Sequence, residues 1–516
     1  MTDNTDIQFN PKARIILQLG DQLIRSENIA VLELIKNSYD ACSNKVTVRL
    51  KNVDNPEYGA IIIEDDGFGM DYDIIRNVWL TPGTTHKKNQ IESENFISPC
   101  NRVPLGEKGI GRFGAHKLGE EIEMISKKEG ASEAHLKIKW MDFDNDDMLA
   151  KVPIDLSERE AKEFTGGKTG TRIIIRGLRN KWSRGGVRSL YRAINSLNSP
   201  FESNNTFRVV FKTDKPQWLE GLLSFEEIKD NSLFNAEAVI EGNQIIDLRY
   251  EFTPWNTLKD LKGRIYKIEE PIDMVQKEYD ESKKKKVFKD IDCSNQNIGR
   301  IKLKMLIFDL DTNILSLGGI QDKRGFKAYL KDNGGIRVYR DGVRVYDYGE
   351  PGNDWLSLDL ERVNLPAARI SNNIVIGAIS LDRLASRDLI EKTNREGFIE
   401  NDAFRTFYSA IRFTLNRIVA QRNIDKDKIR SHYGKSKKKT PVVDNLAILE
   451  EKVKSDLPDG DVKTDILGMI SEISEDYKTI SEVYIRSASA GLSLSIVIHE
   501  IEKIIQEMLY IVEDNE

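Results

Sequence analysis

Residues 60–70 read AIIIEDDGFGM, in which a β-branched run stops at two acidic residues and two glycines. The run is typical of a short strand, and the Asp-Asp-Gly that ends it is typical of a turn. Gly67 and Gly69 permit backbone geometry closed to other residues, so a flat base could approach the main chain here. We predict that Asp66 accepts a hydrogen bond from the exocyclic amine of that base. An ordinary Asp-Gly turn is the competing interpretation.

Two amphipathic helices are predicted before this strand, because apolar residues recur at helical spacing from residue 12 to residue 41, with an interruption at Ser26. In the second helix, ELIKNSYDA places Glu33 and Asn37 four positions apart and therefore on one face. A carboxylate can accept a proton from water, and an amide oxygen suits Mg²⁺, which prefers oxygen ligands. The alternative is that both are ordinary solvated residues on an exposed helix face.

A glycine-rich loop follows at residues 106–120, GEKGIGRFGAHKLGE. Successive backbone N–H groups that lead into a helix N-terminus bind phosphate oxygens, and Lys108 and Arg112 would add positive charge. Gly109, Gly111 and Gly114 also fit the dinucleotide fingerprint, but no strand precedes them, and the Lys-Ser/Thr pair of a Walker loop is absent. We therefore expect a phosphate cradle of another type.

Two further segments complete the expected site. WLTPGTTHKK, at residues 79–88, resembles a mobile lid that could offer Thr84 and Lys87 to phosphates, although a plain surface loop is equally compatible with it. GGKTGT, at residues 166–171, opens a strand, and we expect Thr171 to reach the base beside Asp66.

The bulk composition describes a multidomain protein without membrane segments. The 516 residues exceed what one hydrophobic core accommodates, and no apolar run approaches the roughly 18 residues of a spanning helix. The first residues lack a secretory signal, so a cytoplasmic protein with no membrane partner is expected. Cys42, Cys100 and Cys293 are odd in number and far apart, and all three are predicted to be unpaired thiols. The net charge of −6 gives no global reason to expect nucleic acid.

The chain is predicted to be α+β and to contain four parts. The first, 1–215, holds the motifs above and a largely antiparallel sheet with strands near 45–50, 60–64, 121–126, 135–140 and 171–176. The second, 216–425, is an α/β unit with an insertion near 255–300, strands near 301–308, 335–339 and 373–380, and a terminal amphipathic helix. The third, 426–442, is a basic linker, and the fourth, 443–516, is helical and suited to a coiled coil or to dimerisation.

The order of these motifs resembles the GHKL superfamily, shared by the gyrase B proteins, the heat-shock ninety chaperones, histidine kinases, MutL and MORC. ELIKNSYDA, DDGFGM and GEKGIGRFG are similar to the three nucleotide-binding boxes of the family, and WLTPGTTHKK is similar to the lid of its MORC and chaperone branches. The resemblance covers residues 12 to about 180. It implies a Bergerat-type α/β sandwich that binds ATP and Mg²⁺.

By that resemblance Glu33 is the general base, Asn37 binds the metal and Asp66 recognises adenine. Because hydrolysing members of the superfamily carry a glutamate at this position, the resemblance implies an ATPase. The remaining expected nucleotide contacts are Gly69, Met70, Thr84, Lys87, Gly106, Lys108, Gly109, Ile110, Gly111, Arg112, Phe113, Gly114 and Thr171.

In hydrolysing members a transducer domain supplies a basic residue to the γ-phosphate, and residues 216–425 resemble that domain. Lys392 and Arg395 are our candidates for this residue, with a solvated loop charge as the alternative. Arg340 and Arg344 flank Asp341-Gly342, an expected hairpin turn, and are predicted to lie at the surface.

The resemblance implies an ATP-operated clamp that dimerises through its first domain and its helical tail. The clamped partner could be nucleic acid or a client protein, and chromosome maintenance, chaperoning and defence against phage all fit. The alternative is a histidine-kinase-like protein that phosphorylates His499, which precedes Glu500 on a mostly apolar helix but lacks the downstream proline of a phosphoacceptor box.

Overall fold

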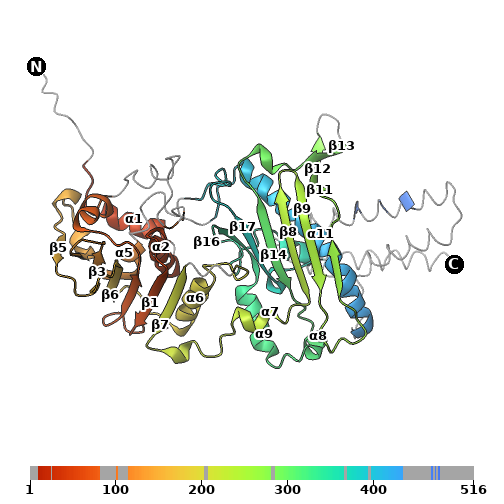
Figure 1. Ribbon diagram of the computed structural model, residues 1–516, viewed down its shortest axis with the longest axis horizontal. Coiled ribbons are helices and arrows are strands. Elements are labelled where there is room, and N and C mark those ends of the chain that lie inside the picture. The colour runs from red at the N-terminus through yellow and green to blue at the C-terminus, as the bar shows by residue number, and fades with distance from the viewer. Residues whose placement is uncertain are drawn as a thin grey trace, which may run out of the picture. The chain divides into compact units, whose positions relative to one another are not determined.

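The computed structural model describes residues 10–24, 26–81, 100, 102, 114–202, 207–280, 285–364, 369–392 and 397–433, with five isolated positions between 467 and 476. The chain divides into two compact units, of which the first comprises residues 1–358 and 370–427 and the second residues 359–369 and 428–516. Figure 1 shows the helices and strands of the first unit. The predicted helical tail from residue 443 onward lies almost wholly outside the described residues.

The first unit contains a seven-stranded sheet in the order β5-β4-β3-β6-β2-β1-β7. All neighbours are antiparallel except β1 and β7, which confirms the expectation of a largely antiparallel sheet. The strands are β1 (Lys45–Lys51), β2 (Ala60–Asp65), β3 (Gly119–Lys127), β4 (Glu133–Lys139), β5 (Asp155–Arg159), β6 (Gly170–Leu178) and β7 (Arg208–Thr213).

Helices that pack on this sheet form its hydrophobic core. They are α1 (Ile15–Leu23), α2 (Glu27–Asp40), α5 (Gly114–Leu118) and α6 (Arg184–Asn195), with the short α3 (Tyr72–Ile74) and η1 (Ile75–Trp79) after β2. Helix α2 starts at Ser26, whose side chain accepts the N–H of Ile29 as an N-cap. Val31 and Ile35 of α2 share one buried cluster with Val48 of β1, so burial of this apolar face holds α2 against the sheet.

A second sheet of eight strands follows in the same unit. Its order is β10-β9-β8-β14-β17-β15-β16, and β11 pairs with β9. The strands are β8 (Phe234–Glu241), β9 (Gln244–Phe252), β10 (Arg264–Lys267), β11 (Ile272–Asp273), β14 (Ile301–Ile307), β15 (Gly335–Arg340), β16 (Val343–Val345) and β17 (Val375–Leu381). The predicted strands near 301, 335 and 373 are therefore confirmed.

The sequence from residue 216 onward also forms helices and a separate two-stranded hairpin. The helices are α7 (Phe225–Lys229), α8 (Thr312–Leu317), α9 (Lys323–Asn333), α10 (Leu358–Asn364) and α11 (Asp402–Tyr433), and the hairpin consists of β12 (Val275–Asp280) and β13 (Lys285–Asp290). The start of β13 includes two lysines of a basic stretch in the expected insertion. The amphipathic helix predicted near residue 404 is confirmed as α11, which buries Phe407, Ile411 and Leu415. Among the residues described, no helix is long and apolar enough to cross a membrane.

Gly69 allows the turn after β2 to lie against β3. Its φ is +64°, and a Cβ built there would overlap the carbonyl oxygen of Lys127. Gly166 has the same φ of +64°, but nothing lies within 4 Å of the position its Cβ would take. A change of each glycine to alanine therefore distinguishes two contributions to stability. At Gly166 only the left-handed backbone conformation costs free energy, whereas at Gly69 the steric overlap with Lys127 adds to it.

We expect Gly166→Ala to lower the free energy of unfolding by about 1 kcal/mol, the cost of placing a side chain in the left-handed region. Gly69→Ala should cost roughly 2 kcal/mol more, because the main chain must also move away from the new methyl group. Urea denaturation of both variants measures the difference. Equal destabilisation would show that β3 does not constrain the turn.

Candidate active site

Asp65, the last residue of β2, is the buried acid at the centre of the candidate site. Residues alternate along β2, so Asp65 shares the buried face with Ile61 and Ile63 and is 8% exposed. Its Oδ2 accepts the hydroxyl of Ser38 at 2.8 Å. Its Oδ1 accepts the N–H groups of Gly67 at 3.0 Å and Thr171 at 3.2 Å. Burial raises the pKa of Asp65 to about 6, against the opposing effect of these hydrogen bonds.

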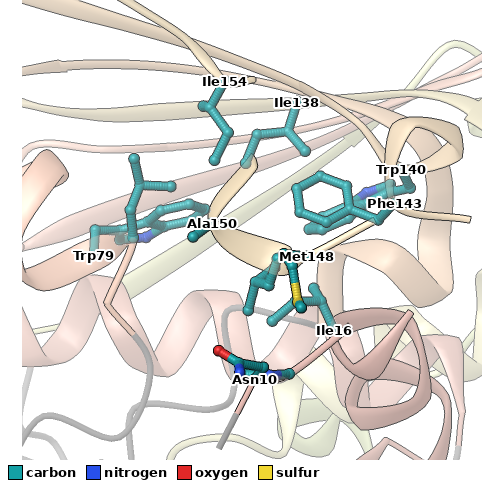
Figure 2. Close-up of a pocket in the computed structure, with 12 residues that line it drawn as sticks. Asn10, Ile16, Trp79, Ile138, Trp140, Phe143, Met148, Ala150 and Ile154 are labelled. Atoms are coloured by element: carbon teal, nitrogen blue, oxygen red, sulfur yellow. The ribbon is translucent and has the colours of Figure 1, made fainter. Parts of the chain in front are cut away.

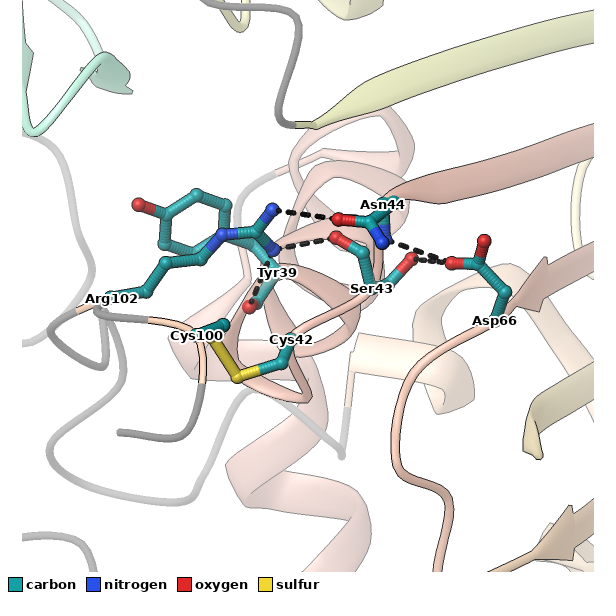
Figure 3. Close-up of a disulfide and its surroundings, with 7 residues drawn as sticks. All are labelled: Tyr39, Cys42, Ser43, Asn44, Asp66, Cys100 and Arg102. Carbon is teal, nitrogen blue, oxygen red and sulfur yellow. Dashed lines mark hydrogen bonds between the residues drawn. A yellow bond between two sulfur atoms is a disulfide. The ribbon is translucent and has the colours of Figure 1, made fainter. Parts of the chain in front are cut away.

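Asp66, the residue predicted to recognise the base, lies on the other side of the strand end, and its described hydrogen bonds go to the start of β1 instead of to Thr171. Its Oδ1 accepts the hydroxyl of Ser43 at 2.8 Å and the N–H groups of Asn44 at 2.8 Å and Lys45 at 2.9 Å (Figure 3). Asp66 therefore stabilises the backbone at the start of β1. The alternation of buried and partly exposed residues in AIIIED indicates that Asp65 and Asp66 point to opposite faces, because a one-residue step along a strand reverses the face.

Ser126 of β3 joins the turn after β2 to β6, and no motif in the sequence pointed to it. The N–H of Met70 donates to Ser126 Oγ at 2.8 Å, and the same oxygen lies 2.8 Å from Thr171 Oγ1. The Thr169 hydroxyl donates to the carbonyl of Gly67 at 2.8 Å. These contacts hold the glycine turn 67–70 between β3 and β6, next to the Asp65 carboxylate.

Glu33 and Asn37 lie on α2, the helix that also supplies Ser38. Glu33 is 2% exposed, and its Oε1 accepts a hydrogen bond from the Lys36 ammonium at 3.3 Å. Asn37 is partly exposed. Because Ser38 binds Asp65 directly, the helix that carries the predicted base and metal ligand is fixed to the acid at the end of β2.

Cys42 and Cys100 form a disulfide with a Cα–Cα distance of 5.8 Å, so the prediction of three unpaired thiols is wrong for this pair (Figure 3). Separation along the chain does not limit a disulfide, because tertiary folding returns residue 100 to the end of α2. The Arg102 guanidinium also stacks over the Tyr39 ring, 4.7 Å from its centroid, and donates to the Ser43 carbonyl. Cys293 is a free, buried thiol, and burial raises its pKa to about 12.

The hairpin β15–β16 connects the second sheet to the helices of the first. Asp341 and Gly342 form its turn, as predicted, with φ of 48° and 78°. Arg340 and Arg344, however, are each 4% exposed, which corrects the expectation that they lie at the surface. Arg340 pairs with Glu391 at 3.2 Å. Arg344 donates a hydrogen bond to the hydroxyl of Ser196, which follows α6, at 2.6 Å. It also forms an ion pair with Glu350.

The hairpin also touches α2. The Tyr39 hydroxyl donates to the carbonyl of Asp341 at 3.5 Å, and Asn198 forms a β-bridge with Val343. Burial is the main reason why the pKa of Tyr39 rises to about 12. The end of α2 therefore contacts the second sheet directly.

Several predicted contacts can be located only in part. Gly114 opens α5 and faces Ala30 of α2, and Lys392 is exposed, with its backbone N–H bonded to the carbonyl of Gly397 at 2.9 Å. Most of the lid and the phosphate cradle lie outside the described residues, as do the second basic candidate and the alternative phosphoacceptor: Thr84, Lys87, Gly106, Lys108, Gly109, Ile110, Gly111, Arg112, Phe113, Arg395 and His499.

An apolar cavity of about 360 Å³ lies elsewhere in the first unit, between α1, the end of η1 and the segment after β4 (Figure 2). Ile16, Trp79, Trp140 and Phe143 contribute to its walls. Neither Asp65 nor Glu33 lines this cavity, and its apolar walls do not suit a phosphate group.

The sheet, the helices that pack on it and the buried Asp65 form a mixed α/β domain, and this part of the chain is similar to known proteins. Residues 24–171 match the family of histidine kinase-, DNA gyrase B-, and HSP90-like ATPases. The resemblance to the GHKL superfamily and the predicted α/β sandwich are therefore confirmed for this part of the chain.

Among curated proteins, the chain is similar to the chaperone protein HtpG. The Rickettsia rickettsii (strain Sheila Smith) protein is 28% identical over 188 residues, which cover 33% of this chain and 27% of the relative. The Nitrobacter winogradskyi protein is 23% identical over 178 residues, which cover 32% of this chain and 26% of the relative. The chain thus spans about a quarter of the length of these relatives.

Asp65 should make the stability of the protein depend on pH. Its native pKa of about 6 lies above the roughly 3.9 of an unfolded aspartate, so the native state holds the proton more tightly. Stability from this group is therefore present below about pH 4 and is lost as pH rises through 6, by on the order of 3 kcal/mol. Asp65→Asn should remove this loss, because an amide does not titrate.

Urea denaturation at pH 4.5 and pH 7 measures the effect as a difference between wild type and Asp65→Asn. Asp66→Asn serves as the control and should keep the wild-type difference. The same pH trend in wild type and Asp65→Asn would contradict the assignment.

Proposed function

We propose that this chain binds ATP with Mg²⁺ and hydrolyses it, with Asp65 as the residue that recognises adenine. The observation that carries the proposal is the buried carboxylate at the end of β2, held by donors from α2, the glycine turn and β6. The family match over residues 24–171 supports the choice of nucleotide.

The hydrogen bonds of Asp65 leave room for one more donor. An ionised carboxylate offers about four acceptor positions. The described residues fill three of them, since Oδ1 accepts two N–H groups and Oδ2 accepts one hydroxyl. The exocyclic amine of adenine is a donor of the required kind, and the glycine turn beside Asp65 lets a flat ring approach the main chain.

Hydrolysis would use groups on α2. Glu33 would take a proton from the attacking water, while the Lys36 ammonium, 3.3 Å away, orients its carboxylate. Asn37 would hold Mg²⁺ through its amide oxygen, and the ion would supply charge neutralisation at the phosphates. An amide that is partly exposed on the same helix suits an ion that keeps several waters.

The remaining charge would come from the glycine loop 106–114 and from the second sheet. Lys108 and Arg112 would contact the phosphates, and Lys392 or Arg395 would reach the γ-phosphate from the loop after β17. Positioning and charge neutralisation supply most of the acceleration in phosphoryl transfer, so one base, one metal and this cradle are sufficient.

We further propose that nucleotide binding drives dimerisation, so that the protein acts as an ATP-operated clamp. The contact between α2 and the β15–β16 hairpin supports this, because it links the nucleotide-binding helix to the second sheet. Similarity to HtpG favours a chaperone-like role over a kinase-like one, and a MORC-like role in the cytoplasm is compatible with the same domain.

Glu33→Gln tests the base and the clamp together. The variant should still bind ATP, because the adenine contact is intact, but phosphate release should fall by at least about 10²-fold. With ATP retained, the variant should also dimerise, which light scattering can follow. Lys259→Gln, a change in an exposed residue of the second sheet region outside the site, is the control.

Each outcome of the Glu33→Gln experiment addresses one part of the proposal. Undiminished phosphate release would refute Glu33 as the base. A variant that binds ATP yet stays monomeric would refute the clamp. Acid-labile label that accumulates on the protein from γ-labelled ATP would instead support phosphorylation of His499.

Asp65→Asn should weaken ATP binding by at least about tenfold, since a hydrogen bond to a charged group is worth roughly 1.5–3 kcal/mol. The amide can still accept the N–H groups of Gly67 and Thr171 and donate to Ser38, but its second hydrogen takes the position of the free acceptor. Asp66→Asn should leave the affinity unchanged. Titration with a fluorescent ATP analogue compares the two, and the opposite ranking would restore Asp66 as the adenine contact.

A further inference from the structure

A second cavity, of about 420 Å³, is lined by residues of α6, the segment 221–226 and α9 in the first unit. Arg188 and Arg192 of α6 line it, together with Arg337 of β15. Neither Asp65 nor Glu33 is among the residues that line it, so it is separate from the proposed ATP site. Its volume falls in the usual range for small-molecule sites, roughly 300–1,000 Å³.

Arg337 is a buried cation without a paired counter-ion among the residues that the structure describes. The residue is 7% exposed, no described carboxylate lies within 4 Å of its guanidinium, and its Nε has no hydrogen-bond partner. Burial lowers the pKa of Arg337, and the nearby charge of Arg344 adds to this effect. Tyr339, Glu350 and Tyr329 oppose that shift, but the Glu350 carboxylate is already paired with Arg344 at 2.6 Å. An uncompensated buried charge is costly, so a fold that keeps one needs a compensating partner.

The other charges around the cavity do not supply that partner. Arg188 Nε donates to the carbonyl of Trp218 at 2.6 Å, so its described partners are main-chain oxygens. Asp332 already pairs with Arg192 at 3.2 Å, and Glu226 pairs with Lys229. Both carboxylates of the wall are thus engaged, and the guanidinium groups of Arg188 and Arg337 leave the cavity with an excess of positive charge.

The rest of the wall mixes apolar and aromatic residues with polar ones, among them Asn195 and Asn333. Tyr191, Leu223, Phe225 and Tyr329 contribute side chains to it. A guanidinium binds carboxylate and phosphate groups in a two-pronged geometry, while aromatic side chains bury the body of a ligand. The cavity therefore combines guanidinium groups that can bind an anion with apolar and aromatic side chains that can contact an organic group.

We propose that this cavity binds a small organic anion, with its phosphate or carboxylate group paired to Arg337. The ligand lies between α6, which belongs to the layer of the first sheet, and α9, which packs by the second. It is a site additional to the ATP site and would bind whether or not nucleotide is hydrolysed.

Isothermal titration of the full chain with pyrophosphate and, separately, with succinate tests the proposal. Wild type should bind at least one of the two, and Arg337→Met should weaken that binding at least tenfold. Arg300→Met, which removes an exposed arginine paired with Glu241 on another part of the second sheet, should bind as wild type does. The tighter of the two probes identifies whether the site prefers phosphate or carboxylate.

Arg337→Met should fold, because it replaces an uncompensated charge with an apolar side chain of similar length, and its melting temperature without ligand should not fall below that of wild type. Arg188→Met, which alters the same cavity from α6, should also weaken binding. Pyrophosphate held only by the ATP site would bind equally to wild type and Arg337→Met. Coincident titration curves for these two proteins, with or without measurable binding, would overturn the proposal.

Discussion

The carboxylate of Asp65 is the constraint on which the first sheet and the candidate site depend. Removing a carboxylate from water is costly, and the cost is offset in part here by the Ser38 hydroxyl and the N–H groups of Gly67 and Thr171. These donors come from α2, the turn after β2 and β6. The three elements must therefore keep a fixed relation for the acid to stay buried, and Gly170, where a Cβ would overlap the carbonyl oxygen of Asp65, permits that approach.

Much of the first domain could be predicted from the sequence, because its signals are local. Helical spacing located α2, and β-branched runs located β2 and β6. The orientation of the acidic pair Asp65–Asp66 was harder to predict. Treating the acidic pair as part of a turn ignored the alternation that continues through the last residue of β2, which places Asp65 inside and Asp66 outside.

The remaining features depend on tertiary packing and leave no local signal. A hairpin turn at Asp341 ordinarily puts its flanking residues in solvent, yet here Arg340 and Arg344 are covered by segments distant in sequence. The Cys42–Cys100 pair likewise becomes visible only when the chain has folded back on itself. The burial of Arg337 without a paired carboxylate among the described residues could not be predicted from the sequence either, because it depends on which residues the folded chain places around its guanidinium.

The contact between Tyr39 and the hairpin turn at Asp341 has a thermodynamic consequence. Because the contact joins the two elements, a shift of α2 is coupled energetically to a shift of the β15–β16 hairpin. If ATP, as proposed above, and a second ligand on the second sheet each bind more tightly to one hairpin position, then each changes the affinity for the other by the same factor. The linkage is reciprocal, so an effector of this protein could be discovered by measuring either partner in the presence of the other.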